Sequence, residues 1–392
     1  MKRMKRRHML LKHSIRKRDG TKNERVRYGK ERDTMSLFVP FNDPKFTTLA
    51  QMIYRIQFEK DPILSQEFDD RRKRLMYADI TYNISFLFTA VRFQDEKIFK
   101  EYAKWFHELL RSLMKDFTKE RVTTIIVDHF RIMKTVIEEE GSSILSQQEI
   151  STASSYLLSA VDAVVEQRED DFSGSGFLQG DHLEIRQAYL QALLEGETEK
   201  AEEIIEQAKN SGITLLDIYE HILAKTMHEI GVLWHRNIIS VDKEHYATSV
   251  TQTVMSHYFE EIFSRPRKNK VLVSLAVGSE LHEMGIRMLS DIFEHEGWDT
   301  HYLGAGVSFE KVMEAIRLYK PQLVALSVTM PPYLPHCEEM VRGIKEAHPE
   351  LLVAVGGQGF KSASNLWREW GADYYGNKAM DLLKWAEYPC KS

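Results

Sequence analysis

A glutamate and a histidine share one short loop that follows a strongly apolar segment. The segment VLVSLAV, residues 271–277, is followed by GSELHEMG, in which Glu280 precedes His282 by two residues and Gly285 follows it by three. A histidine in this place can bind a metal through one ring nitrogen while a neighbouring carboxylate holds the other nitrogen. Gly285 removes a side chain where a bulky group would lie against the backbone. The alternative is a solvent-exposed loop histidine without a ligand.

Small and hydroxyl-bearing residues end two further apolar segments. LVALSVT ends with Ser327 and Thr329, and LLVAVGG ends with Gly356 and Gly357. If both segments are strands of one parallel sheet, their carboxyl ends lie at the edge where such sheets bind ligands. We therefore expect a deep slot there, with hydroxyl donors on its wall, beside His282.

A tryptophan and a Glu-His pair stand together in GVLWHRNIISVDKEHY, residues 231–246. Trp234 is separated by nine residues from Glu244, which His245 follows directly. The stretch is typical of a junction between two amphipathic helices, with Ser240 or Asp242 as the N-cap of the second helix. Ordinary packing would make Trp234 part of a helical core and the pair a polar first turn.

The elements that position these residues fall into two classes. After Pro266, five short apolar segments alternate with amphipathic helical segments, which predicts a flavodoxin-like parallel sheet of five strands over residues 266–392. Before it, apolar residues recur with helical period and no strand pattern is seen. We predict an all-helical domain over residues 35–168, a linker over 169–181 and a four-helix bundle over 182–263. Thr118 and Ser146 are expected N-caps.

Charge is distributed unevenly along the 392-residue chain. Residues 1–34 hold 14 Lys and Arg against 4 Asp and Glu, whereas the whole chain has a net charge of −5. This arm is expected to be disordered; it is either a segment that contacts nucleic-acid phosphates or a leader before Met35. The absence of a long apolar run and the presence of only Cys337 and Cys390 predict a cytoplasmic protein without a membrane segment.

Together, the three motifs after residue 270 resemble the cobalamin-binding domain. The family pattern Asp/Glu-x-His-x-x-Gly, Ser-x-Leu/Thr and Gly-Gly is matched by Glu280-x-His282-x-x-Gly285, by Ser327 with Thr329, and by Gly356 with Gly357. The resemblance implies that His282 is the lower axial ligand of cobalt and that Glu280 orients it. It further implies that Ser327, Thr329 and the glycines line the channel for the nucleotide tail.

The helical bundle resembles the cap that covers the upper face of cobalamin in the same family. Trp234, Glu244 and His245 are similar to the Trp-x(9)-Glu-His signature of the light-responsive, adenosylcobalamin-binding subfamily. The resemblance implies that Trp234 shields the adenosyl group and that Glu244 accepts hydrogen bonds from its ribose. It also implies that His245 approaches cobalt after photolysis.

The first helical domain weakly resembles globin-like sensor domains, including those of photocobilins, which pair cobalamin with biliverdin. His107, His129, Trp105 and Tyr82 are the candidates for a bilin pocket, with Tyr77, Phe86 and Phe106 as further lining residues. No cysteine lies in this domain, so biliverdin would bind non-covalently; haem is another candidate. The alternative is that the aromatic residues are helical core and the histidines structural.

These features predict a cobalamin-dependent light sensor that is not an enzyme. Photolysis of bound adenosylcobalamin would alter the packing of the cap. That change would in turn alter the assembly of a homo-oligomer or the contact with an effector protein. One alternative is a corrinoid methyl carrier of a methyltransferase system, although its usual Lys-Asn after the loop glycine is absent here. The other is a cobalamin sensor that is independent of light. A mutase is disfavoured because no catalytic barrel is predicted.

Overall fold

The computed structural model describes residues 44–167, 176–363 and 365–388. Residues 37–392 form one compact unit. The predicted basic arm, residues 1–34, and residues 169–175 of the predicted linker lie outside the described ranges. Within these ranges, no helix is both long enough and apolar enough to cross a membrane.

The first part of the described chain is entirely helical. Aspartate, threonine and serine side chains accept hydrogen bonds from backbone N–H groups at the starts of its helices, which fixes where each begins. The predicted caps Thr118 and Ser146 are confirmed, and Ser146 forms a capping box with Glu149. The helices are α2 (Pro44–Lys60), α3 (Pro62–Glu67), α4 (Asp70–Phe93), α5 (Glu96–Leu113), α6 (Lys119–Glu140) and α7 (Gln147–Glu166).

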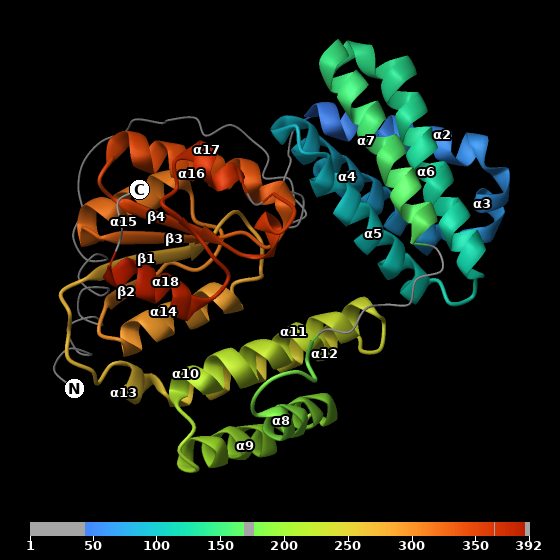
Figure 1. The fold of residues 1–392 in the computed structure, drawn as a ribbon. Helices are drawn as coiled ribbons and strands as arrows, with labels where there is room; N and C mark the ends of the chain where they lie inside the picture. The colour runs from blue at the N-terminus through green and yellow to red at the C-terminus, as the bar shows by residue number, and fades with distance from the viewer. Residues whose placement is uncertain (1–43, 168–175, 364, 389–392) are drawn as a thin grey trace, which may run out of the picture. The chain divides into compact units, whose positions relative to one another are not determined.

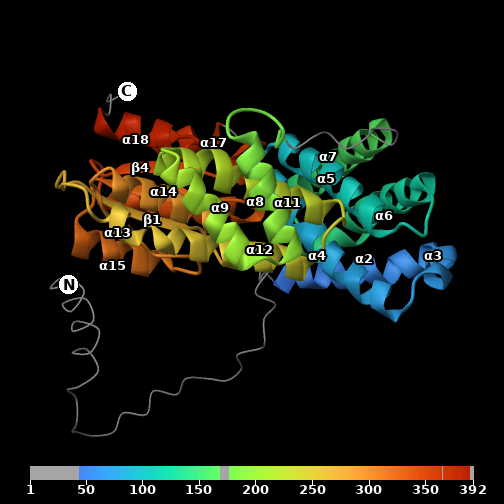
Figure 2. The same cartoon turned by 90° about the horizontal axis from the view of Figure 1, so that it is seen from below.

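Four further helices form the cap bundle, which Figure 2 shows from below. They are α8 (Leu183–Glu195), α9 (Thr198–Asn210), α11 (Ala224–His235) and α12 (Val241–His257), and they pack around a shared apolar core. A short helix, α10 (Leu215–Asp217), and a π-helical turn, Ile218–Leu223, lead into α11. Helix α13 (Phe259–Ile262) follows the bundle.

Arg186 anchors the segment that enters the cap bundle. Its side chain is fully buried and donates hydrogen bonds to the backbone carbonyls of Phe177, Gln179, Asp181 and His221, at 2.6–3.0 Å. A buried guanidinium is stable when its donors are satisfied in this way. The end of the predicted linker, residues 176–181, is therefore held against the cap.

The rest of the chain forms a five-stranded parallel sheet in the order β2-β1-β3-β4-β5. This order is flavodoxin-like, so the predicted fold class is confirmed. The strands are apolar because helices cover both faces. The strands are β1 (Val271–Ala276), β2 (Asp299–Tyr302), β3 (Leu323–Ser327), β4 (Leu352–Gly356) and β5 (Tyr374–Tyr375), and the helices α14 (Met284–His295), α15 (Phe309–Tyr319), α16 (Leu334–Ala347), α17 (Leu366–Trp370) and α18 (Ala379–Glu387).

Alternate residues of the strands point to opposite faces of the sheet. Val273, Leu275 and Val324 pack on the side of α15 and α16, whereas Leu272 and Ala325 pack on the side of α14 and α18. In register, Ala276, Ser327 and Gly356 lie side by side at the carboxyl ends of β1, β3 and β4. The sequence motifs therefore meet at one edge of the sheet.

Candidate functional site

His282 lies in the loop between β1 and α14, near the carboxyl edge of the sheet. Its side chain is exposed, and no hydrogen bond to it is found among the described residues. The protein packed around it lowers the pKa of the imidazole, while the nearby carboxylate of Glu244 raises it. Because desolvation has the larger effect, the pKa of the imidazole is lowered, which favours the neutral form that binds a metal.

Gly285 opens space next to His282. It lies in the first turn of α14, and a Cβ built on it would have no atom within 4 Å. The turn therefore leaves open space at this position, and the expectation that a bulky group lies there stays a prediction.

Glu280 occupies a different place from the one expected. It is buried, and its two carboxylate oxygens accept hydrogen bonds from the backbone N–H groups of Thr329 and Met330, at 2.8 and 2.9 Å. Burial raises the pKa of this carboxyl to about 7, against the lowering effect of those two donors. In this structure Glu280 therefore joins the β1 loop to the β3 loop, and the expectation that it orients His282 stays a prediction.

The glycines at the tip of β4 also have another explanation. A Cβ at Gly357 would collide with the carbonyl oxygen of Val328, and one at Gly356 would lie 2.5 Å from the carbonyl oxygen of Gly376. Gly357 also has a φ of +98°, which disfavours other residues. These two glycines are required by close backbone packing, whereas Ser327 and Thr329 are half-buried at the same edge.

Tyr333 is a residue that the sequence motifs do not predict. Its hydroxyl lies 3.0 Å from the Ser279 hydroxyl, and its ring fills the space where a Cβ of Gly278 would be. Tyr333 is almost fully buried, and it fixes the start of the loop that carries His282. The only signal in the sequence is the aromatic residue after the Pro331-Pro332 pair, which has no set spacing to the histidine.

The cap contributes the second half of the candidate site. Trp234 is half-buried at the carboxyl end of α11, and Glu244 and His245 lie in the first turns of α12. His245 Nε2 is 3.5 Å from Glu244 Oε2, and Thr248 donates a hydrogen bond to Glu244 Oε1 at 3.1 Å. Ser240 occupies the N-cap position of α12, but its side chain makes no capping hydrogen bond.

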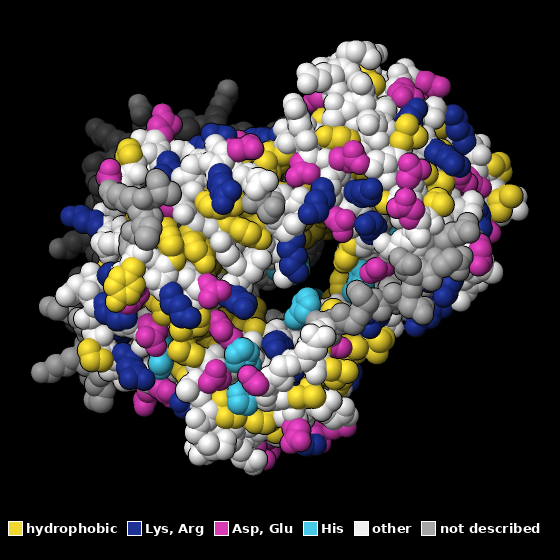
Figure 3. All heavy atoms as spheres, viewed as in Figure 1, with side chains coloured by type: hydrophobic (Ala, Val, Ile, Leu, Met, Phe, Trp, Pro, Cys, Tyr) yellow, Lys and Arg dark blue, Asp and Glu magenta, His cyan; other side chains and the backbone are white. Residues whose placement is uncertain are grey.

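Electrostatics links the two halves. Glu244 of the cap is near enough to His282 of the sheet domain to raise the pKa of its imidazole. The structure therefore brings Glu244 near His282, and His245 pairs with Glu244 within the cap. Over the cap helices, Figure 3 shows histidine side chains beside acidic ones. An exposed histidine with no hydrogen bond from the described residues and with a cap carboxylate nearby fits a cobalt corrinoid held between sheet and cap.

The four candidates for a bilin pocket have different surroundings. His129 is buried between Gln57 and Asn83, and His107 is buried against the Thr123 hydroxyl at 2.9 Å. Trp105 stacks on His235 of the cap at 5.1 Å, and Tyr82 is half-buried on α4. Each histidine thus has a partner inside the helical core, and a bilin pocket lined by these four residues stays a prediction.

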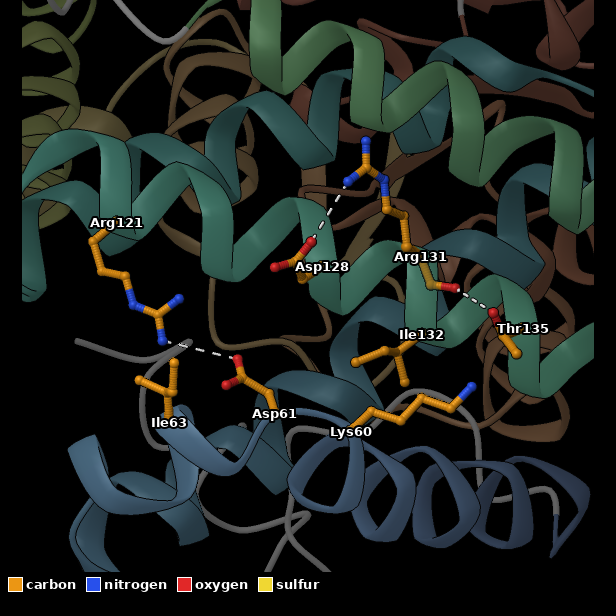
Figure 4. A pocket seen from close by; sticks show the side chains of 8 residues that line it. All are labelled: Lys60, Asp61, Ile63, Arg121, Asp128, Arg131, Ile132 and Thr135. Carbon is orange, nitrogen blue, oxygen red and sulfur yellow. Dashed lines mark hydrogen bonds and ion pairs between the residues drawn. The ribbon is translucent and has the colours of Figure 1, made fainter.

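A surface hollow in the helical region has no link to these residues. It lies between α2, α3 and α6, and Figure 4 shows its lining. Arg121 pairs with Glu67 and Asp61, and Arg131 pairs with Asp128, so the charges of these two arginines are balanced.

Comparisons with known proteins match the cap and the sheet. Models of a B12 binding domain match residues 270–384 and residues 185–258. Trimethylamine corrinoid protein 1 of Methanosarcina acetivorans is 23% identical over 201 residues, which are 49% of this chain and 90% of the relative. Dimethylamine corrinoid protein 1 of Methanosarcina mazei is 24% identical over 195 residues, 47% of this chain and 83% of the relative.

A solved structure is also similar. The Methanosarcina barkeri monomethylamine corrinoid protein has 19% identity and a TM-score of 0.47, over 52% of this chain and 97% of that one. The two B12 binding domain matches coincide with the cap bundle and with the parallel sheet that carries His282. The chain thus contains a cap and a sheet domain of the cobalamin-binding type.

Proposed function

We propose that this chain is a corrinoid carrier, which holds cobalamin between the cap bundle and the carboxyl edge of the sheet. His282 would be the lower axial ligand, and the cap would cover the upper face. The observation that carries the proposal is the exposed imidazole of His282, which lies at the carboxyl edge of the sheet and near Glu244 of the cap. Bound cobalamin would supply a reactive cobalt–carbon bond.

The relatives favour a methyl-carrier role over light sensing. They are corrinoid proteins named for trimethylamine and dimethylamine. In this role the chain has no reaction of its own, and a separate methyltransferase reaches the upper face of the corrinoid. Trp234 and Glu244 would then exclude water and hold the upper face until that partner docks.

Light sensing remains a second candidate, because one observation favours it. Trp234, Glu244 and His245 lie at one junction of the cap, and the side chain of His245 is 69% exposed. It is therefore free to turn towards the corrinoid, as a replacement ligand for cobalt would have to do. In this candidate the upper ligand is adenosyl, and its loss on illumination changes assembly or contact with an effector. The comparisons lend this candidate no support.

One experiment separates the two candidates. The purified chain is mixed in the dark with methylcobalamin and, separately, with adenosylcobalamin, and binding is followed by the absorption spectrum before and after green illumination. The carrier proposal expects methylcobalamin to bind at least as tightly as adenosylcobalamin. It also expects that, once the bound corrinoid has been freed of its upper ligand and reduced with an added chemical reductant, a cognate methyltransferase moves a methyl group from a methylated amine to it and releases the demethylated amine.

Trp234→Ala and Trp234→Phe refine the result. In a methyl carrier, Trp234 would exclude water from the upper face without contacting a specific upper ligand, so Trp234→Ala should weaken binding of both cobalamins equally. A selective loss of adenosylcobalamin in Trp234→Ala, restored by Trp234→Phe, with an illuminated spectrum that changes in His245→Ala, would overturn the carrier proposal in favour of the light sensor. Failure to bind either cobalamin would overturn both.

A further inference from the structure

The end of α11 that carries Trp234 is held by a helix outside the cap. His235 stacks on the indole of Trp105, with ring centroids 5.1 Å apart and an interplanar angle of 26°. Its Nε2 also lies 3.4 Å from Glu108 Oε2. Trp105 and Glu108 both belong to α5, so two side chains one helical turn apart contact the imidazole of His235.

A second contact lies two residues further along. Asn237 has a φ of +52°, in the left-handed region, and its N–H donates to the carbonyl of Trp234 at 2.8 Å. This conformation ends α11. The Asn237 side-chain amide then donates to the carbonyl of Ser112, near the end of α5, at 3.2 Å. Both the last residue of α11 and its terminating turn are therefore bound to α5.

The other end of α11 is attached to the sheet domain. In the π-helical turn that precedes it, the Tyr219 hydroxyl donates to Asp291 Oδ2 on α14 at 3.2 Å. Next to it, Glu220 Oε1 accepts from the N–H of Met380 at 3.3 Å. A π-helical turn places consecutive side chains differently from an α-helix and is often found at functional sites. Helix α11 is thus fixed at its start by the sheet domain and at its end by α5.

From these contacts we propose that Trp105, Glu108, His235 and Asn237 are positioning residues for the upper face of the site. Neighbouring residues of an α-helix are about 100° apart around its axis, so fixing His235 also fixes the direction of Trp234. Helix α5 therefore sets how the cap covers the upper face, and its release lets the Trp234 end move away from the sheet. This inference deepens the proposed function and rests on it for the identity of the bound group.

Glu108, which contacts His235, also contacts the end of the helical region. Its other oxygen, Oε1, accepts a hydrogen bond from the Gln167 side chain at 3.1 Å, and Gln167 also donates to the carbonyl of Lys104 at 3.3 Å. Gln167 caps α7 and is buried. The carboxylate of Glu108 thus contacts α7 through Gln167 and the cap through His235. A change in the packing of α5 against α7 would therefore change the contact that holds His235.

The first test needs no corrinoid. Hydrogen exchange of the full chain is measured for peptides covering residues 231–246 and, as an internal reference, residues 286–295 of α14. Trp105→Ala should raise the exchange rate of 231–246 about two- to tenfold, the range expected for loss of one aromatic pair, and leave 286–295 unchanged. Trp105→Phe should restore protection. Leu158→Ala is the matched control, since Leu158 is an exposed apolar residue of α7 in the same helical region.

The second test uses hydroxocobalamin added to the same variants. If α5 positions the upper face, Trp105→Ala and Asn237→Ala should increase the rate at which bound hydroxocobalamin dissociates, by a similar two- to tenfold factor, while the absorption bands that report His282 ligation stay the same. Unchanged exchange of 231–246 in Trp105→Ala overturns the inference even if cobalamin binds. Absence of cobalamin binding in the unmodified chain overturns the proposed function, while the exchange result still decides the role of α5.

Discussion

Two histidines in this molecule both have a lowered pKa but differ in what surrounds their ring nitrogens. His129, on α6, is buried; its Nδ1 lies 2.9 Å from Gln57 Oε1 and its Nε2 lies 3.0 Å from the Asn83 amide nitrogen. One tautomer satisfies both contacts, since Nδ1–H donates to Gln57 and Nε2 accepts from Asn83. His282 is exposed, and in the described chain neither ring nitrogen has a hydrogen bond.

The difference lies in what holds the neutral form. Burial lowers the pKa of His129 to about 4, and its two partners then fix the ring inside the helical core. Nearby protein atoms also lower the pKa of His282, but its side chain is exposed and its ring nitrogens have no hydrogen bond from the described residues. A satisfied histidine stabilises a fold, whereas a neutral, unsatisfied one at an open edge is ready for a ligand.

The largest effect is expected when the imidazole of His282 is removed, which tests the contrast between the two histidines directly. We expect His282→Ala to weaken cobalamin binding about a thousandfold, or ~4 kcal/mol, because a direct metal ligand is worth more than its outer partners. Spectroscopic titration with hydroxocobalamin measures this. His336→Ala, which removes an exposed histidine of the same domain, is the control and should bind normally. Equal binding by both variants would contradict the assignment of His282.

The reverse expectation holds for His129. His129→Ala should destabilise the chain by about 3 kcal/mol, since it opens a cavity and leaves buried groups of Gln57 and Asn83 unpaired. The melting temperature measured by calorimetry should fall, whereas it should stay within a degree or two in His282→Ala. If His282→Ala were the less stable variant, the distinction between a structural and a ligating histidine would be lost.

The pH dependence of stability provides a third test. The pKa of His129 is lowered from 6.5 to about 4 in the folded chain, so below pH 6.5 the unfolded chain binds a proton that the folded chain does not. The contribution of the neutral His129 to the free energy of unfolding is complete above pH 6.5 and is lost as the pH falls towards 4. The loss is about 2 kcal/mol between pH 7 and pH 5. The melting temperature of the unmodified chain should therefore drop more steeply over this range than that of His129→Gln. Parallel curves would be the contrary result.

Substitution of Gly285 is expected to have the smallest effect, and it separates the stability of the fold from the binding of cobalamin. Gly285→Ala should stabilise the fold slightly, by up to about 1 kcal/mol, because the residue is helical and its Cβ would meet open space. The same methyl group should weaken cobalamin binding several-fold if the corrinoid lies against this turn. Calorimetry and spectroscopic titration of one variant give both values, and tighter or unchanged binding would place the corrinoid elsewhere.

Sequence patterns were sufficient for the architecture and for the residues that meet at the sheet edge. The apolar strands and their spacing predict the parallel sheet, which puts Ser327 beside Gly356 and near the His282 loop. Hydrogen-bond partners were not predictable. Glu280 is two residues from His282 in sequence, yet its carboxylate finds two N–H groups of the β3 loop, because a buried carboxylate takes the nearest backbone donors.

The helical region shows the same limit. Trp105 and His129 both have the residue type and surroundings of a chromophore pocket, and helical periodicity places them in one domain. Which neighbour each one meets depends on helix packing. Trp105 reaches the cap and His129 meets Asn83, and no local pattern contains either contact.

The Arg186 anchor also limits how far the helical region can travel. Because Arg186 holds residues 177–181 against the cap, the covalent connection begins at Gln167 and ends near Gly176. A fully extended chain across that interval reaches at most about 30 Å. Helix α5, once released from His235, therefore stays covalently tethered near its binding partner. Release and recapture would be unimolecular, with an equilibrium that does not change when the protein is diluted.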